Sequence, residues 1–129
     1  MKLDPLGEAI RIFMEIKQEV GPNEELGSEL RTRARQIPEL IEELGLIPAL
    51  SFCFAKAKEN KSYELYVKAM LRYLKDLQVI TKDPNDAFSN PDGILNEIHP
   101  KSTIIVQLLR PFLIEFKRLC EATWRARSG

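Results

Sequence analysis

The stretch Leu30–Ala57, LRTRARQIPELIEELGLIPALSFCFAKA, decides the fold, because a basic helical segment passes directly into an almost wholly apolar one. Apolar residues in its first half recur at helical steps of three and four positions: Leu30, Ala34, Ile37, Ile41 and Leu44. This spacing predicts a helix that is capped by Asn23 and runs through Gln36. We expect a kink or a new start at Pro38, because proline in a helix interior costs about 3 kcal/mol.

The second half of the stretch follows Gly45, which suits a helix end. From Leu46 to Lys58 the segment has no polar face, since leucine, isoleucine, alanine, phenylalanine and cysteine occupy most of its positions. A helix that is apolar on all sides is typical of a buried location. We therefore predict that this helix lies at the centre of the fold.

Two more helices are predicted, one before this stretch and one after it. The capping pair Asp4 and Pro5 begins an N-terminal helix over residues 5–20. A helix over residues 62–79 has one apolar stripe with basic residues outside it, which predicts packing at the surface.

The remainder of the chain contains a long connection and a last helix. Residues 80–101 are rich in proline, asparagine and aspartate and predict a loop with one short helical turn at residues 93–98. Ser102 is expected to cap the last helix, and Pro111 is expected to kink it. No segment alternates as a strand does, so we predict an all-α fold with one domain over residues 1–129, a compact bundle of five to six orthogonally packed helices.

Composition agrees with a globular domain, because 44% of the residues are hydrophobic and 29% are charged. Neither a signal peptide nor a membrane-spanning run is visible, so a cytoplasmic protein with no membrane partner is expected. Cys53 and Cys120 both lie in apolar surroundings and are expected to be free thiols.

Charge is balanced overall but is unevenly distributed along the chain. Residues 1–30 contain seven acidic and three basic side chains, whereas residues 99–129 contain six basic and two acidic ones. If these segments lie at opposite ends of the domain, copies can stack head to tail through charge. The residues predicted to meet are Glu8, Glu15 and Glu19 of one copy and Lys117, Arg118 and Arg125 of the next. Solvated charge with no such role is the alternative.

The sequence contains no recognisable catalytic constellation. His99, the only histidine, precedes a proline and has no second ligand at metal-binding spacing. The glycines lie far apart, so they do not form a phosphate-binding loop. We therefore expect a protein that is not an enzyme and that uses neither a metal nor another cofactor.

Three arginines lie close together at the start of the stretch Leu30–Ala57. On a helix, Arg31 and Arg35 share a face, and Arg33 points about 200° away from Arg31. Guanidinium groups match phosphates well, so the arginines are candidates for contact with nucleic acid. Pairing with acidic residues of the same chain is the alternative.

The stretch also resembles the characteristic segment of the small-subunit proteins of type III-B CRISPR effectors, the Cmr complexes. That family has a basic helix, a turn with a Leu-Pro-x-Leu-Ile-like pattern, a Gly-Leu pair and an apolar helix ending in Ala-Lys. The matching residues are Arg31, Arg33, Arg35, Ile37, Pro38, Leu40, Ile41, Gly45, Leu46, Ala49, Leu50, Phe52, Ala55 and Lys56. The segments YELYVKAMLRYL (63–74) and LLRPFLIEFKRLCEATW (108–124) resemble later helices of the family.

The resemblance implies a non-catalytic structural subunit, copies of which stack as a filament along crRNA and its target RNA, beside other subunits of the effector. The residues predicted to contact RNA are Arg31, Arg33, Arg35, Lys56, Lys61 and Lys68. Two other functions are compatible with the residues alone, namely a helical nucleic-acid-binding regulator and a helical adaptor that binds only protein.

Overall fold

The computed structural model describes residues 4–126, and within this range it contains helices and no strands. The α-helices are α1 (Pro5–Val20), α2 (Glu24–Leu44), α3 (Leu46–Ala57), α4 (Lys61–Asp76), α5 (Pro91–Ile98) and α6 (Ser102–Thr123). Short 3₁₀ turns at Asp86–Phe88 and His99–Lys101 lie in the connection between α4 and α6. The predicted all-α fold is therefore confirmed.

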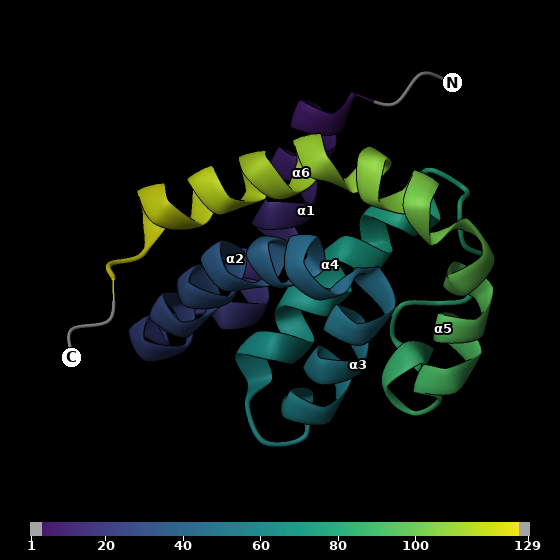
Figure 1. The fold of residues 1–129 in the computed structure, drawn as a ribbon. Coiled ribbons are helices and arrows are strands. Elements are labelled where there is room, and N and C mark those ends of the chain that lie inside the picture. The colour runs from purple at the N-terminus through teal and green to yellow at the C-terminus, as the bar shows by residue number, and fades with distance from the viewer. Residues whose placement is uncertain (1–3, 127–129) are drawn as a thin grey trace.

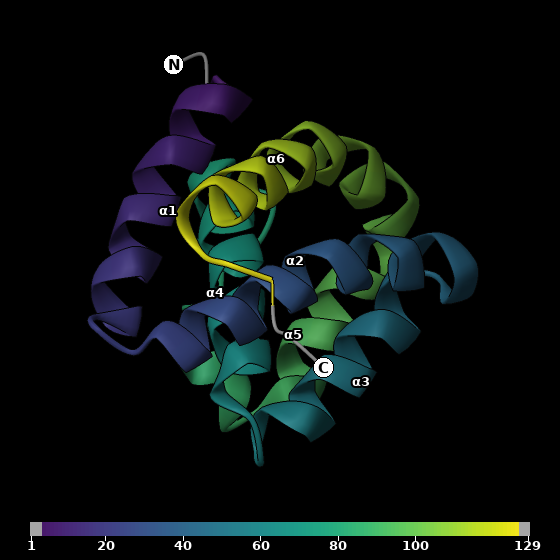
Figure 2. The same ribbon diagram turned by 90° about the vertical axis from the view of Figure 1, so that its left-hand side faces the viewer.

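The helices cross one another around a shared core. Figure 1 shows α6 lying across the top of the molecule, with α1 behind it and α2 beneath it. In the view of Figure 2, α1 stands at the left edge and α6 crosses it rather than running alongside. The helices α3 and α5 close the lower side of the molecule.

Asparagine and aspartate side chains fix the starts of three helices. Asp4 accepts a hydrogen bond from the Leu6 N–H at 3.1 Å, and Asn23 accepts one from the Leu26 N–H at 3.0 Å, as the sequence predicted. Asn60 does the same for α4. Ser102 does not cap α6, because the preceding 3₁₀ turn leads directly into the helix and makes Ser102 its first residue.

The predicted end of the second helix before Pro38 is wrong. The helix α2 continues through Pro38 to Leu44 and ends at Gly45, whose φ of 94° lies in the left-handed region. Ile37 and Ile41, on either side of the proline, are 0% and 5% exposed. Burial of such a side chain contributes about 1.5–3 kcal/mol, so the two together offset the helical hydrogen bond that proline cannot make.

The central helix is α4, and not α3 as the sequence predicted. Ten of the sixteen residues of α4 are buried, among them Leu65, Tyr66 and Met70. In contrast, Ser51 and Ala55 of α3 are exposed. Small side chains do not mark a polar face in a sequence, yet exposing them to water costs little free energy. The sequence therefore predicted deeper burial for α3 than the structure shows.

Aromatic side chains join α1, α4 and α6. Tyr73 of α4 stacks on Phe112 of α6 with ring centroids 4.4 Å apart. Phe13 of α1 lies 5.7 Å from Phe116 and 5.4 Å from Trp124. The acidic N-terminal helix and the basic C-terminal helix are therefore neighbours, so the condition for head-to-tail contact through these charges, opposite ends of the domain, is not met.

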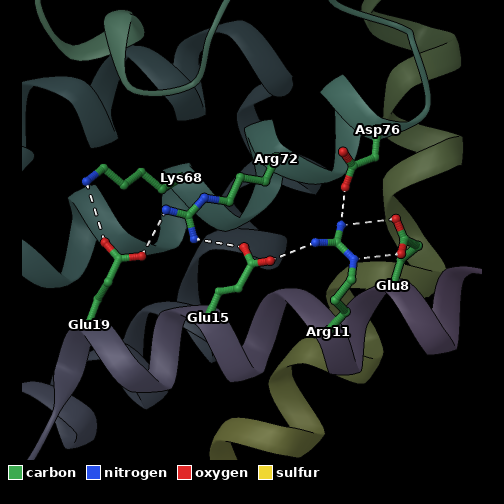
Figure 3. A network of polar contacts seen from close by, with 7 residues as sticks. All are labelled: Glu8, Arg11, Glu15, Glu19, Lys68, Arg72 and Asp76. Carbon is green, nitrogen blue, oxygen red and sulfur yellow. Dashed lines mark hydrogen bonds and ion pairs between the residues drawn. The ribbon is translucent and has the colours of Figure 1, made fainter.

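Ion pairs join one side of α1 to α4 (Figure 3). We define the α1–α4 network by its members: Glu8, Arg11, Glu15, Glu19, Glu64, Lys68, Arg72 and Asp76. Its cations alternate with its carboxylates, so each acidic side chain of α1 in the network contacts a cation. The network covers the seam between the two helices on the surface.

Arg11 is the branching point of the α1–α4 network. It contacts Glu8 at 3.0 Å and Glu15 at 2.7 Å on its own helix, and Asp76 on α4. The hydrogen bonds from Arg11 lower the pKa of Glu8. Burial raises the pKa of Asp76, against the attraction of the same guanidinium group.

Gly27 allows α2 to approach the end of α6. A Cβ atom at this position would come within 2.3 Å of the Trp124 indole ring, which is 6% exposed. Gly27→Ala should therefore lower the free energy of unfolding by about 1–3 kcal/mol, the usual cost of overpacking. The measurement is urea denaturation followed by the emission of Trp124, the only tryptophan.

The control is Gly7→Ala at an exposed position of α1, where a Cβ atom would meet only the movable carboxylate of Asp4 at 3.1 Å, so the free energy of unfolding should change by less than about 1 kcal/mol. Equal stability of the two variants, with unchanged tryptophan emission, would contradict the close packing at Gly27.

Arg11→Gln should lower the free energy of unfolding by about 1 kcal/mol at pH 7, because exposed ion pairs contribute up to about 1 kcal/mol each. The lowered pKa of Glu8 stabilises the fold above the unfolded value of about 4.3, and this contribution disappears as the pH falls through the folded value. The difference between Arg11→Gln and the wild type should therefore shrink below about pH 4.

Urea denaturation at several pH values measures this difference. Arg110→Gln is the control, since Arg110 has a single exposed partner, Glu42, at 3.0 Å. If both variants lose the same stability at every pH, the network contributes no more than one isolated pair.

Candidate nucleic-acid interface

The arginines Arg31 and Arg35 open into one groove beside α2. Its volume is about 380 Å³, and Thr32, Gln36, Glu39 and Ala126 also line it, so the groove holds two arginines and one carboxylate. The opposite side of α2 packs into the core, so the two arginines are held on the outward side of a rigid helix. The predicted shared face of Arg31 and Arg35 agrees with this arrangement.

The two guanidinium groups of this groove are only partly neutralised. Arg35 is 58% exposed and its Nε lies 3.5 Å from a carboxylate oxygen of Glu121 on α6. Arg31 forms no ion pair with any residue in the range 4–126, and its Nε is buried without a hydrogen-bond partner there. A buried donor of this kind is costly unless a ligand or water accepts its hydrogen bond.

Arg33 points away from this groove, as helical geometry predicted. Its guanidinium carbon lies 4.4 Å from the centroid of the Tyr63 ring on α4. The Arg33 Nε is buried and also lacks a partner among the described residues. A cation over an aromatic face is attracted by the ring quadrupole, so Tyr63 orients the guanidinium without neutralising it.

Phe52 and Lys56 of α3 extend this arrangement. Phe52 meets Tyr63 edge to face with centroids 5.8 Å apart, and the Lys56 Nζ lies 5.7 Å from the Phe52 centroid. We define the cation–aromatic cluster as Arg33, Phe52, Lys56 and Tyr63. Tyr63 is 6% exposed, so the rings serve to position the two cations rather than to stack on a base.

The other two lysines predicted to contact RNA lie elsewhere. Lys61, the first residue of α4, is exposed and lines a groove shared with Asn23, Glu25 and Glu29. Lys68 is 17% exposed and pairs with Glu64 at 3.3 Å and Glu19 at 3.7 Å within the α1–α4 network. The structure does not bring either lysine together with the arginines of α2.

The residues predicted to form the contact between stacked copies differ in how far partners in their own chain neutralise them. Glu8, Glu15 and Glu19 face α4 and take part in the α1–α4 network (Figure 3), where Arg11 and Arg72 are their principal partners. The acidic side chains are therefore already neutralised within their own chain.

The basic residues predicted to form this contact, at the C-terminal end of α6 and just beyond it, make fewer ion pairs within the chain than the acidic residues of α1 do. Arg118 is 69% exposed and lies 3.5 Å from Glu115, one turn away. Lys117 is half-buried and Arg125 is exposed beyond the helix end, and neither forms an ion pair with the described residues. Lys117 and Arg125 are therefore unpaired within the described chain, whereas Arg118 and the acidic residues of α1 already have partners.

The thiols of the chain are unsuited to nucleophilic chemistry. Cys53 and Cys120 are free and buried, as predicted. Burial raises the pKa of Cys53 to about 12 and raises that of Cys120 as well, so both stay protonated at neutral pH.

Over residues 4–126, no three histidine, cysteine, aspartate or glutamate side chains are grouped so as to hold a metal ion. Across the same range, no helix has both the length and the apolar character that crossing a bilayer requires.

Sequence reasoning found the arginines but missed the groups that orient them. Tyr63 and Glu121 are distant from α2 in sequence and meet it only through the fold. The apolar stripe of the fourth helix included Tyr63, yet nothing in that pattern distinguishes a ring that supports a cation from any other core residue.

The sequence was compared with protein families, curated proteins and solved structures. It matches the family described as CRISPR-associated protein (Cas_Cmr5) over residues 7–104. Neither the curated proteins nor the solved structures gave a match. The matched region contains most of α1, all of α2 to α5 and the start of α6, and therefore the arginines of the groove and the whole cation–aromatic cluster. Since the match spans well over half of the chain, the protein belongs to the Cmr5 family, the small subunits of the type III-B CRISPR complex.

Proposed function

We propose that this subunit is a non-catalytic structural component, and that it offers the arginine groove and the cation–aromatic cluster to the phosphates of crRNA or target RNA. Copies of the subunit would stack along the RNA beside the other subunits of a cytoplasmic effector complex. Family membership supports a place in the complex, and the geometry of α2 supports the RNA contact.

The observation that carries the proposal is that Arg31 and Arg33, both half-buried on α2, form no ion pair with residues 4–126. Among residues 4–126, ion pairs involve the cations Arg11, Arg35, Lys68, Arg72, Arg110 and Arg118. Arg31 and Arg33 are held on one helix with their charges unneutralised by acids. Because the Nε atoms themselves are buried, a phosphate oxygen would accept from the terminal Nη atoms of these guanidinium groups.

The contact should be weak for one copy. The net charge of the chain is zero, so there is little long-range attraction to RNA. Few phosphates are contacted by each copy, and affinity would come from the repetition of this face along the strand. Lys68 is left out of the proposed face because it is paired twice, and Lys61 is left out because acidic residues surround it.

Arg31→Ala with Arg35→Ala should weaken RNA binding by the assembled complex and flatten its salt dependence. Each phosphate contact contributes about 0.7 to 0.9 to the slope of log affinity against log salt, so loss of two contacts per copy should be measurable. Filter binding or fluorescence anisotropy from about 50 to 200 mM salt gives the slope.

The control is Lys75→Ala with Lys82→Ala, which removes the same charge from two exposed positions at the end of α4 and in the following loop. A reduced slope in the arginine variant alone supports the proposed face. Identical slopes in both variants would assign Arg31 and Arg35 to intramolecular roles, as in an adaptor that binds only protein.

A further inference from the structure

An apolar groove lies between the second half of α2 and α6. Its volume is about 240 Å³, and its apolar lining includes Pro38, Ile41, Val106, Leu109, Leu113 and Ile114. We call this the α2–α6 groove. Ile114 is 50% exposed at its edge, so the groove is open to a partner and not filled by the chain itself.

Three charged residues also line the α2–α6 groove. Glu42 and Arg110 pair with each other at 3.0 Å. Glu39 is exposed, forms no ion pair with residues 4–126, and also lines the groove of Arg31 and Arg35, so it lies between the two grooves. The groove therefore presents an apolar floor with one unneutralised carboxylate beside it.

An apolar stripe of complementary character lies on α1. Leu6, Ile10 and Met14 follow one another at steps of four residues and are 53%, 47% and 60% exposed. We call these three residues the α1 stripe. Lys17 lies three positions after Met14 on the same face, is exposed, and forms no ion pair with the described residues. The stripe thus combines three protruding aliphatic side chains with one free cation.

The α1 stripe and the α2–α6 groove belong to different sides of the molecule. Figure 2 shows α1 at the left edge and the first half of α6, which contributes to the groove, at the upper right. One chain cannot bring its own stripe to its own groove. A contact between these two surfaces must therefore be between copies and heterologous, which leaves a free stripe and a free groove for further copies.

We propose that the α1 stripe of one copy docks in the α2–α6 groove of the next, with Lys17 placed beside Glu39. The mode is that of a helix presenting side chains at helical spacing to an apolar groove. The opposite signs of Lys17 and Glu39 favour this occupant over a partner of unrelated sequence. The inference rests on the stacking of copies in the proposed function. It assigns the contact between copies to the α1 stripe instead of the acidic residues of α1, because those residues are neutralised within their own chain.

Cysteine cross-linking tests the contact directly. Ile10→Cys and Ile114→Cys are mixed, assembled into the effector complex, and treated with a short bismaleimide. Cys53 and Cys120 are buried and protonated, so they should not compete. A cross-linked dimer should form in the mixture, and neither variant should give it alone. Complexes that contain several copies but yield no dimer would overturn the docking while leaving the stacking intact. Complexes that contain a single copy would overturn the stacking itself.

Two further variants establish which surfaces meet. Ile10→Glu and Ile114→Glu should each weaken the association of copies about tenfold, equivalent to 1.4 kcal/mol. A mixture of the two should still form pairs, through the stripe of one and the groove of the other, but no longer chains in sedimentation. Persistence of longer chains, or a mixture as dissociated as the single variants, would overturn the proposed pairing of surfaces.

Reversal of the charge pair gives a readout that loss of folding cannot produce. Lys17→Glu should weaken the association about two- to fivefold, as expected for an exposed ion pair. Glu39→Lys in the same chain should restore it, since each contact then has its charges exchanged. Absence of rescue, with both variants folded by circular dichroism, would contradict the placement of Lys17 beside Glu39.

Discussion

The contact of Phe13 with Phe116 and Trp124 is the constraint on which the rest of the structure depends. It fixes α1 against α6 and, with Tyr73 on Phe112, places α4 beneath them. Once α1 is held in this way, one of its sides must meet α4 and another must face solvent. The first carries the carboxylates and the second carries the exposed aliphatic residues, so the roles of the two sides follow from the aromatic packing.

Much of the fold was predictable because its signals are local. Caps at Asp4 and Asn23, helix ends at glycine and apolar spacing of three and four all depend on residues that are near in sequence. The errors concern interactions between residues that are distant in sequence. A helix end was predicted at Pro38 because the sequence does not show that Ile37 and Ile41, its neighbours on α2, are buried. The helix α3 was predicted to be more central than α4 because the sequence does not show that Lys68 and Arg72 reach acidic partners on α1.

In the candidate site, too, the local features were predictable from the sequence and the long-range ones were not. The separation of Arg33 from Arg31 and Arg35 follows from helical geometry and was predicted. Which cations are neutralised was not predictable, because it depends on the partners that the fold supplies from other helices. Lys68 and Arg31 carry the same charge, yet one has two carboxylates within 4 Å and the other forms no ion pair among residues 4–126. Local density of arginine is therefore a weaker guide to a phosphate-binding face than the pairing of each cation.

Trp124 anchors the end of α6 against Gly27 and Phe13, and two residues later Ala126 lines the groove of Arg31 and Arg35. At the other end of the described chain, Leu6 lies two residues after the capping residue Asp4 and belongs to the α1 stripe. Both ends of the described range, residues 4–126, thus lie beside surfaces assigned to partners. A fluorophore or affinity handle fused at either end would crowd one of them. The exposed connection at Asp83 and Asn85, far from both surfaces in sequence and outside every helix, is the better attachment point for single-molecule work on this subunit.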